Sequence, residues 1–219
     1  MKIHAEALLF DNDGTLVSSL ESVHRCWSRW AEEYGIAAED FARVELHGRP
    51  AVEIIAELLP ADRTAGALAR IEQLEVDDVP GGVELLPGTK ELLASLPAGR
   101  WAVVTSATRP LAEARLREAG IEAPVVIAAD DITRGKPDPE PYLLAAAKLG
   151  VDPAACVVFE DAPAGLAAGR AAGMATVALT TTHDPSELVA DVVVPDLSAV
   201  SAQATDGGVT VVAVGGPSA

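Results

Sequence analysis

The chain has 219 residues, of which 49% are hydrophobic and 22% are charged, and its formal net charge is −17 at pH 7. This apolar content is too high for a disordered chain, and the length allows one large domain, or one domain with a smaller insertion. The negative charge repels phosphate backbones and anionic lipids, so we expect neither nucleic acid nor a membrane surface as a partner.

The N-terminal segment and the two cysteines limit the class of protein further. Charges at Lys2 and Glu6 argue against a signal peptide, and no apolar run approaches the roughly 18 residues of a membrane span. Cys26 and Cys156 lie far apart without a CxxC pair, so we expect buried reduced thiols rather than a disulfide or zinc scaffold. We expect a soluble, cytoplasmic protein that is a monomer or a weak homodimer.

Short apolar runs that stop at polar residues predict the strands of a buried sheet. They cover residues 7–10, 101–104, 125–129 and 156–159, with weaker runs at 175–179 and 192–194. Helical patterns at 108–120, 138–150 and 163–173 separate them, each with proline near its start and glycine at its end. This alternation predicts an α/β fold whose core is a doubly wound, Rossmann-like parallel sheet.

The segment 18–85 interrupts this alternation and is almost wholly helical in pattern. Residues 18–21 (SSLE) fit a capping box before an amphipathic helix over 23–34, and further helices are expected at 50–59 and 61–79. We therefore expect a core of residues 1–17 and 86–219 with an inserted all-helical cap domain at 18–85. Residues 201–214 are expected to form a terminal hairpin around Asp206, Gly207 and Gly208.

Acidic and hydroxyl side chains follow the predicted strands. Because ligands bind at the carboxyl ends of parallel strands, these side chains should converge on one site. They are Asp11, Asp13, Ser106, Asp130, Asp131, Glu160 and Asp161. A chain of net charge −17 needs a local positive group to bind an anionic small molecule, and a metal ion is the most economical one.

The sharpest feature is the loop Asp11-Asn12-Asp13-Gly14, in which two carboxylates can approach one ligand. A calcium loop of the EF-hand type needs glycine at its sixth position, whereas here glycine is fourth and follows a strand. Taken alone, the loop also fits a plain turn whose aspartates cap the next helix.

Four segments in order resemble the motifs of the haloacid dehalogenase-like phosphohydrolases. They are FDNDGTLV (10–17), VVTS (103–106), GKPDP (135–139) and FEDAPAG (159–165), so the resemblance covers essentially the whole chain. The sequence looks closest to the branch of glycerol-phosphate and 2-deoxyglucose-6-phosphate phosphatases, with β-phosphoglucomutase a nearby relative. The position of the helical insertion also resembles that of this family's cap.

The resemblance implies a role for each core motif. Asp11 would be the nucleophile, and Asp13 the general acid and then the base. Mg²⁺ would be bound by Asp11, the backbone carbonyl of Asp13, and Asp161, with Glu160 in an outer position. Ser106 and the amide of Ala107 would bind the phosphoryl group, which Lys136 would stabilise together with the charge of the nucleophile.

Substrate contacts outside these motifs are expected at Asn12, through its backbone amide, and on the cap at His47, Arg49 and His24. Two positions depart from the family pattern: Asn12 replaces an apolar residue, and Ser18 replaces an aspartate that caps a helix comparably well. Neither removes a reacting group.

The resemblance implies a Mg²⁺-dependent phosphatase of small phosphorylated sugars or polyols. Two alternatives remain open. One is a phosphomutase on the same scaffold, and the other is a non-catalytic sensor of a phosphorylated metabolite. The presence of Asp11, Asp13 and Lys136 favours an enzyme.

Overall fold

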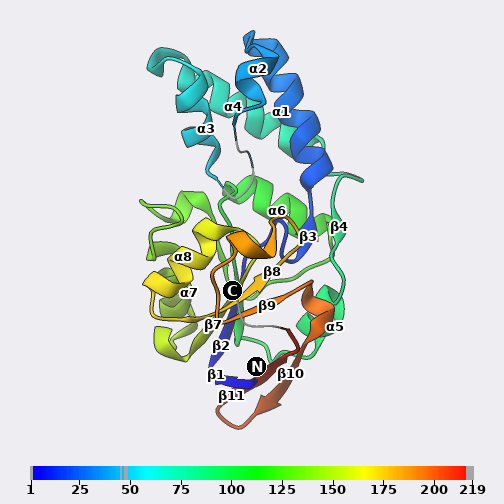
Figure 1. Cartoon of the computed structure of the whole chain (residues 1–219), viewed down its shortest axis with the longest axis vertical. Coiled ribbons are helices and arrows are strands. Elements are labelled where there is room, and N and C mark those ends of the chain that lie inside the picture. The colour runs from blue at the N-terminus through cyan, green and yellow to red at the C-terminus, as the bar shows by residue number, and fades with distance from the viewer. Residues whose placement is uncertain (1, 45, 47–48, 216–219) are drawn as a thin grey trace.

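The computed structural model describes residues 2–44, 46 and 49–215. At its centre is a six-stranded parallel sheet with the strand order β6-β5-β2-β7-β8-β9 (Figure 1). The strands are β2 (Ala7–Phe10), β5 (Trp101–Val104), β6 (Val126–Ile127), β7 (Cys156–Glu160), β8 (Ala175–Leu179) and β9 (Val192–Val194). Each corresponds to an expected run, so the predicted α/β fold with a doubly wound parallel core is confirmed.

Helices cover both faces of this sheet, which explains why its strands are apolar without alternation. Leu8 and Phe10 of β2 pack in one cluster with side chains of α5 (Thr89–Ala94) and α6 (Arg109–Glu118). Ala7 and Leu9 belong to the opposite cluster, with side chains of α7 (Glu140–Leu149) and α8 (Pro163–Ala171). Helix α7 ends as expected at Gly150, which adopts a left-handed conformation with φ of 70°.

The connections between strands place a crevice above β2 and β7. From β2 the chain moves outward through β5 to β6, and from β7 it moves the other way through β8 to β9. The carboxyl ends of the adjacent strands β2 and β7 therefore meet where the direction of winding reverses, which is where ligands bind in such sheets.

The helical insertion lies beyond this end of the sheet (Figure 1). It contains α1 (Leu20–Tyr34), α2 (Ala38–Phe41), α3 (Ala51–Leu58) and α4 (Ala61–Asp77). These helices share a hydrophobic core of their own, in which Trp27, Trp30 and Ile71 are buried. A short antiparallel pair, β3 (Val17–Ser18) with β4 (Glu84–Leu85), connects these helices to the rest of the chain.

The expected capping box at the start of α1 does not form. Ser19 occupies the N-cap position with φ of −124° and ψ of 7°, and its side chain makes no capping hydrogen bond. Its hydroxyl instead donates to Oδ1 of Asp13 at 2.7 Å. A hydrogen bond to a charged carboxylate is stronger than one between the hydroxyl and a backbone N–H group of the helix. The Ser19 side chain therefore turns toward Asp13 in the core.

The opposite end of the core carries a three-stranded antiparallel sheet of β1 (Lys2–Ala5), β11 (Gly208–Ala213) and β10 (Val200–Thr205). The hairpin of β10 and β11 agrees with the expected terminal hairpin, whereas β1 was not predicted. Short 3₁₀ helices lie at Ala129–Asp131, Pro153–Ala155, Pro185–Glu187 and Leu197–Ala199. Among the helices of the described ranges, none has both the length and the apolar character to cross a membrane.

Candidate active site

The residues expected at the centre of the site meet at the ends of β2 and β7. The ammonium group of Lys136, which precedes α7, donates to Oδ1 of Asp11 at 2.6 Å and to Oε1 of Glu160 at 2.6 Å. It also donates to the carbonyl oxygen of Val104 in β5 at 2.9 Å. All three charged side chains are buried, so one lysine links the ends of three strands.

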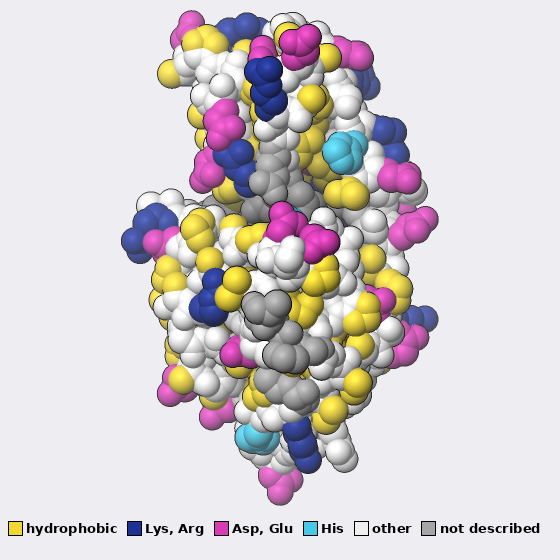
Figure 2. All heavy atoms as spheres, viewed as in Figure 1, with side chains coloured by type: hydrophobic (Ala, Val, Ile, Leu, Met, Phe, Trp, Pro, Cys, Tyr) yellow, Lys and Arg dark blue, Asp and Glu magenta, His cyan; other side chains and the backbone are white. Residues whose placement is uncertain are grey.

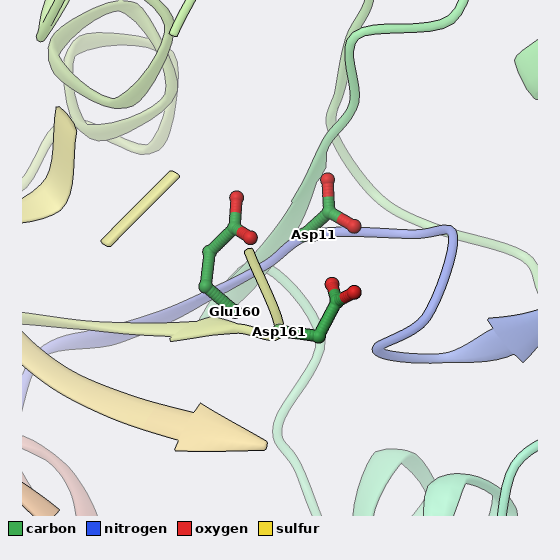
Figure 3. Close-up of side chains that lie close together, drawn as sticks. All are labelled: Asp11, Glu160 and Asp161. Atoms are coloured by element: carbon green, nitrogen blue, oxygen red, sulfur yellow. The ribbon is translucent and has the colours of Figure 1, made fainter. Parts of the chain in front are cut away.

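Asp11, Glu160 and Asp161 form a compact carboxylate cluster (Figure 3). One oxygen from each lies within 4.8 Å of the others. Two glycines make room for it, because a Cβ atom at Gly165 would stand 1.8 Å from Oε1 of Glu160, and one at Gly14 would stand 2.2 Å from Oδ2 of Asp161. Gly14 also has a φ of +95°, which few other residues adopt.

The cluster has an unfavourable electrostatic balance. Burial raises the pKa of the Asp11 carboxyl well above its ordinary value; Lys136 opposes this effect, while Glu160, Asp161 and Asp13 add to it. Burial would lower the pKa of Lys136, but Asp11 and Glu160 hold it above its ordinary value, so the lysine stays charged. One cation thus faces several carboxylates, a setting that favours the binding of a divalent cation.

The hydrogen bonds distinguish Glu160 from Asp161. Oε1 of Glu160 accepts from Lys136 and from the Tyr142 hydroxyl at 2.7 Å, and Oε2 accepts from the backbone N–H of Ala162 at 3.3 Å. Asp161 accepts instead from neutral hydroxyls, those of Thr15 at 3.1 Å and of Thr182. Glu160 therefore faces a cation and two further donors, which suits an outer position, whereas Asp161 is better suited to contact a metal.

Asp13 lies in a different network. Its Oδ1 accepts from the Ser19 hydroxyl at 2.7 Å and lies 3.0 Å from Nη1 of Arg115, while its Oδ2 accepts from the Asn12 side-chain amide at 3.2 Å. Arg115 on α6 also donates through Nη2 to Oε1 of Glu75 on α4 at 3.4 Å. This network joins the loop that carries Asp11 and Asp13 to the cap.

A cavity of about 330 Å³ lies between cap and core above these side chains. Its core wall includes Asp11, Asp13, Ser106, Ala107, Lys136, Glu160 and Asp161, and its cap wall includes Trp27, Arg49, Glu72 and Glu75. Figure 2 shows acidic side chains on both the cap and the core near the zone where they meet. The cavity therefore combines a charged floor with a mixed polar and apolar roof.

The cap residues that were expected to contact substrate differ in whether they line the cavity. Arg49 lines the cavity and binds Glu57 through two hydrogen bonds of 2.5 and 3.3 Å. His24 is exposed and is not among the described residues that line the cavity, because Val23 and Trp27 occupy the inward face of α1. His47 lies outside the described residues.

Sequence reasoning missed Ser19, Glu75, Arg115 and Tyr142 as parts of the site. For Arg115 a signal was present, because the buried face of α6 otherwise consists of Leu111, Ala112 and Leu116. A charged residue in an apolar helical stripe indicates a buried partner. The serine and the tyrosine carried no comparable signal.

The comparisons with known proteins agree with this geometry. The family model for haloacid dehalogenase-like hydrolases matches residues 5–173. Hexitol phosphatase A of Escherichia coli (strain K12) is 41% identical over 192 residues, which cover 85% of this chain and 88% of that protein. 2-Deoxyglucose-6-phosphate phosphatase 1 of Saccharomyces cerevisiae is 34% identical, and the alignment covers 90% of each chain. 

A solved structure of similar fold contains phosphate. CbbY from Rhodobacter sphaeroides in complex with phosphate matches with a TM-score of 0.75 and 28% identity, over 89% of this chain and 95% of that chain. The motifs, the geometry of the Asp11 cluster and these matches lead to one conclusion: the chain belongs to the haloacid dehalogenase-like hydrolases.

Proposed function

We propose that this chain is a Mg²⁺-dependent phosphatase that hydrolyses small sugar- or polyol-phosphate monoesters through an aspartyl-phosphate at Asp11. The observation that carries this proposal is the buried contact of Lys136 with Asp11 and Glu160 on the floor of a cavity. The relatives named above, a hexitol phosphatase and a 2-deoxyglucose-6-phosphate phosphatase, support the reaction and the substrate class.

The chain's own residues divide the reaction between them. An oxygen of Asp11 attacks phosphorus, the bond from phosphorus to the leaving oxygen breaks, and Asp13 gives that oxygen a proton. Asp13 then takes a proton from the water that cleaves the aspartyl-phosphate. Lys136, the Ser106 hydroxyl and the Ala107 N–H stabilise the oxygens of the transferred group.

The residues present fit a magnesium ion. The carboxylates of Asp11 and Asp161 and the backbone carbonyl of Asp13 would hold it, and Glu160 would support them from an outer position. When bound, Mg²⁺ offsets the repulsion between carboxylates and phosphate and polarises the phosphoryl oxygens. The raised pKa of Asp11 is consistent with a site that needs this additional positive charge.

Phosphate release from a panel of phosphorylated polyols, hexoses and deoxyhexoses tests the reaction directly. We expect wild-type protein to release phosphate from members of this panel and from p-nitrophenyl phosphate, and Asp11→Asn to release none while remaining folded. Appreciable turnover by Asp11→Asn would exclude Asp11 as the nucleophile. Glucose 1-phosphate serves as a further substrate, because an isomerised sugar phosphate in place of free phosphate would identify a mutase.

The metal can be tested apart from activity. In a chelator-treated sample, added Mg²⁺ should raise the unfolding temperature by an amount that grows with its concentration, because it binds only the folded chain. In Asp161→Asn this rise should be lost or strongly reduced. An equal rise in both proteins would show that the ion binds elsewhere.

A further inference from the structure

Arg115 is a buried cation to which the mechanism above gives no role. Its side chain extends from the inner face of α6 and is only 4% exposed. A buried guanidinium is strongly unfavourable unless carboxylates and hydrogen bonds compensate it. A leucine would fit the surrounding stripe of Leu111 and Leu116, so the charge calls for an explanation.

Its partners come from two different parts of the molecule. Nη1 lies 3.0 Å from Oδ1 of Asp13 in the core, and Nη2 lies 3.4 Å from Oε1 of Glu75 in the cap. Burial would lower the pKa of Arg115, but Asp13 and Glu75 hold it above its ordinary value. The arginine therefore remains charged, and one guanidinium is shared between the catalytic loop and α4.

The arrangement also distinguishes the two oxygens of Asp13. Oδ1 receives a cation and the Ser19 hydroxyl, which stabilise negative charge on it. Oδ2 receives the neutral amide of Asn12. The guanidinium and the Ser19 hydroxyl therefore hold the Asp13 carboxyl group in one orientation through Oδ1.

We propose that Arg115 is a positioning residue that couples closure of the cap to proton transfer by Asp13. With the cap closed, Glu75 and Asp13 hold the guanidinium between them, and the guanidinium fixes the carboxyl group of Asp13. Glu75 travels with α4 when the cap opens, so the arginine loses one of its two carboxylate partners and Asp13 loses a fixed orientation. This proposal rests on the proposed function.

The step it affects is the first half of the reaction. An oxygen of Asp11 forms a bond to phosphorus, the bond from phosphorus to the leaving oxygen breaks, and the proton of the Asp13 carboxyl group moves to the leaving oxygen. An alkoxide, the leaving group of a sugar or polyol phosphate, needs this proton, whereas p-nitrophenolate leaves without one. Arg115 should therefore matter for alkyl phosphates and little for aryl phosphates.

The test compares kcat/KM for a polyol phosphate with kcat/KM for p-nitrophenyl phosphate. The parameter kcat/KM is used because it reports the first step and not hydrolysis of the intermediate. In Arg115→Met we expect kcat/KM to fall about a hundredfold for the alkyl substrate and no more than about threefold for the aryl one. Arg117→Met, which removes an exposed arginine from the same helix, is the matched control and should resemble wild type.

Glu75→Gln tests the connection to the cap. This substitution should lower kcat/KM for the polyol phosphate about tenfold. Adding it to Arg115→Met should lower that kcat/KM little further, because both substitutions act through one interaction. Equal losses on the two substrates in folded Arg115→Met, or a full additional loss from Glu75→Gln, would overturn the proposal. If Arg115→Met does not fold, Glu75→Gln and Arg115→Lys decide by the same ratio. Failure of the proposed function is distinct, since wild type would then release phosphate from neither substrate.

Discussion

Asp11 and Asp13 are two positions apart in one loop, yet they belong to networks of different kinds. Asp11 contacts Lys136, which also contacts Glu160 and Val104, and all of these belong to the sheet end or the loops beside it. Asp13 is reached by the N-cap residue of the first cap helix and by Arg115, whose other partner lies on α4. The surroundings of Asp11, the proposed nucleophile, are thus set by the core alone, whereas those of Asp13, the proposed proton donor, depend on where the cap lies.

The Asp11 network consists of Asp11, Lys136, Glu160 and the carbonyl group of Val104. The comparison predicts that damage to this network reduces the stability of the fold as well as activity. In Lys136→Met, Asp11 and Glu160 would remain buried without their cation. We expect phosphatase activity to be lost and the free energy of unfolding to fall by about 3–5 kcal/mol in the absence of metal ions. Urea unfolding in the presence of a chelator measures this change.

The control for this variant is Lys148→Met, which removes an exposed lysine from α7 and should leave both quantities near their wild-type values. A Lys136→Met protein as stable as wild type would contradict the assignment of Lys136 as the cation that holds this network together.

Gly165→Ala perturbs the same network from the backbone, with a smaller expected effect. The new Cβ would stand 1.8 Å from Oε1 of Glu160, so the carboxylate has to leave its place beside Lys136 and Tyr142. We expect a loss of about 1–3 kcal/mol in unfolding free energy and a lower kcat. Thermal or urea unfolding and phosphate release measure the two effects.

Gly66→Ala provides the matched comparison, because Gly66 lies within α4 with no neighbouring atom within 4 Å of a Cβ. There the substitution should stabilise the protein by about 0.4–1 kcal/mol through the unfolded chain. The sign of the change should therefore differ between the two helical glycines, and equal signs would show that Glu160 does not depend on the space at Gly165.

The Asp11 network was predictable because it depends on a rule that acts along the chain. Asp11, Glu160 and Asp161 each follow a buried strand, and the carboxyl ends of parallel strands must lie at one edge of the sheet. The approach of Lys136, in a loop, was implied by resemblance. Arg115 and Glu75 meet only because α4 of the cap docks near α6, and no spacing within either helix expresses that contact.

The cap also shows that contacts between elements could not be predicted from the sequence. Its helices were expected from their patterns, but the face that each one turns toward the cavity depends on how they pack together. On α1 the residues Val23, Trp27 and Trp30 are buried, so His24 is exposed, although it lies near Trp27 on the helix. Helical periodicity identifies the buried stripe, but it does not state whether the adjoining residue faces a ligand or solvent.

Ser19 offers the smallest and most discriminating change, because it stands at the N-cap position of α1 while its hydroxyl donates to Asp13. As a helix cap it would support α1, and its removal would cost about 1 kcal/mol of stability without altering substrate preference. As a donor to Oδ1 of Asp13 it supports the proton donor, so Ser19→Ala should lower kcat/KM about fivefold for a polyol phosphate and hardly at all for p-nitrophenyl phosphate.

Both roles predict a slightly lower unfolding temperature, so the ratio of the two kcat/KM values is the measurement that separates them. Ser18→Ala, at the neighbouring serine in β3, is the control and should keep the wild-type ratio. A wild-type ratio in Ser19→Ala would mean that its hydroxyl does not support Asp13, and that among these two residues only Arg115 does so.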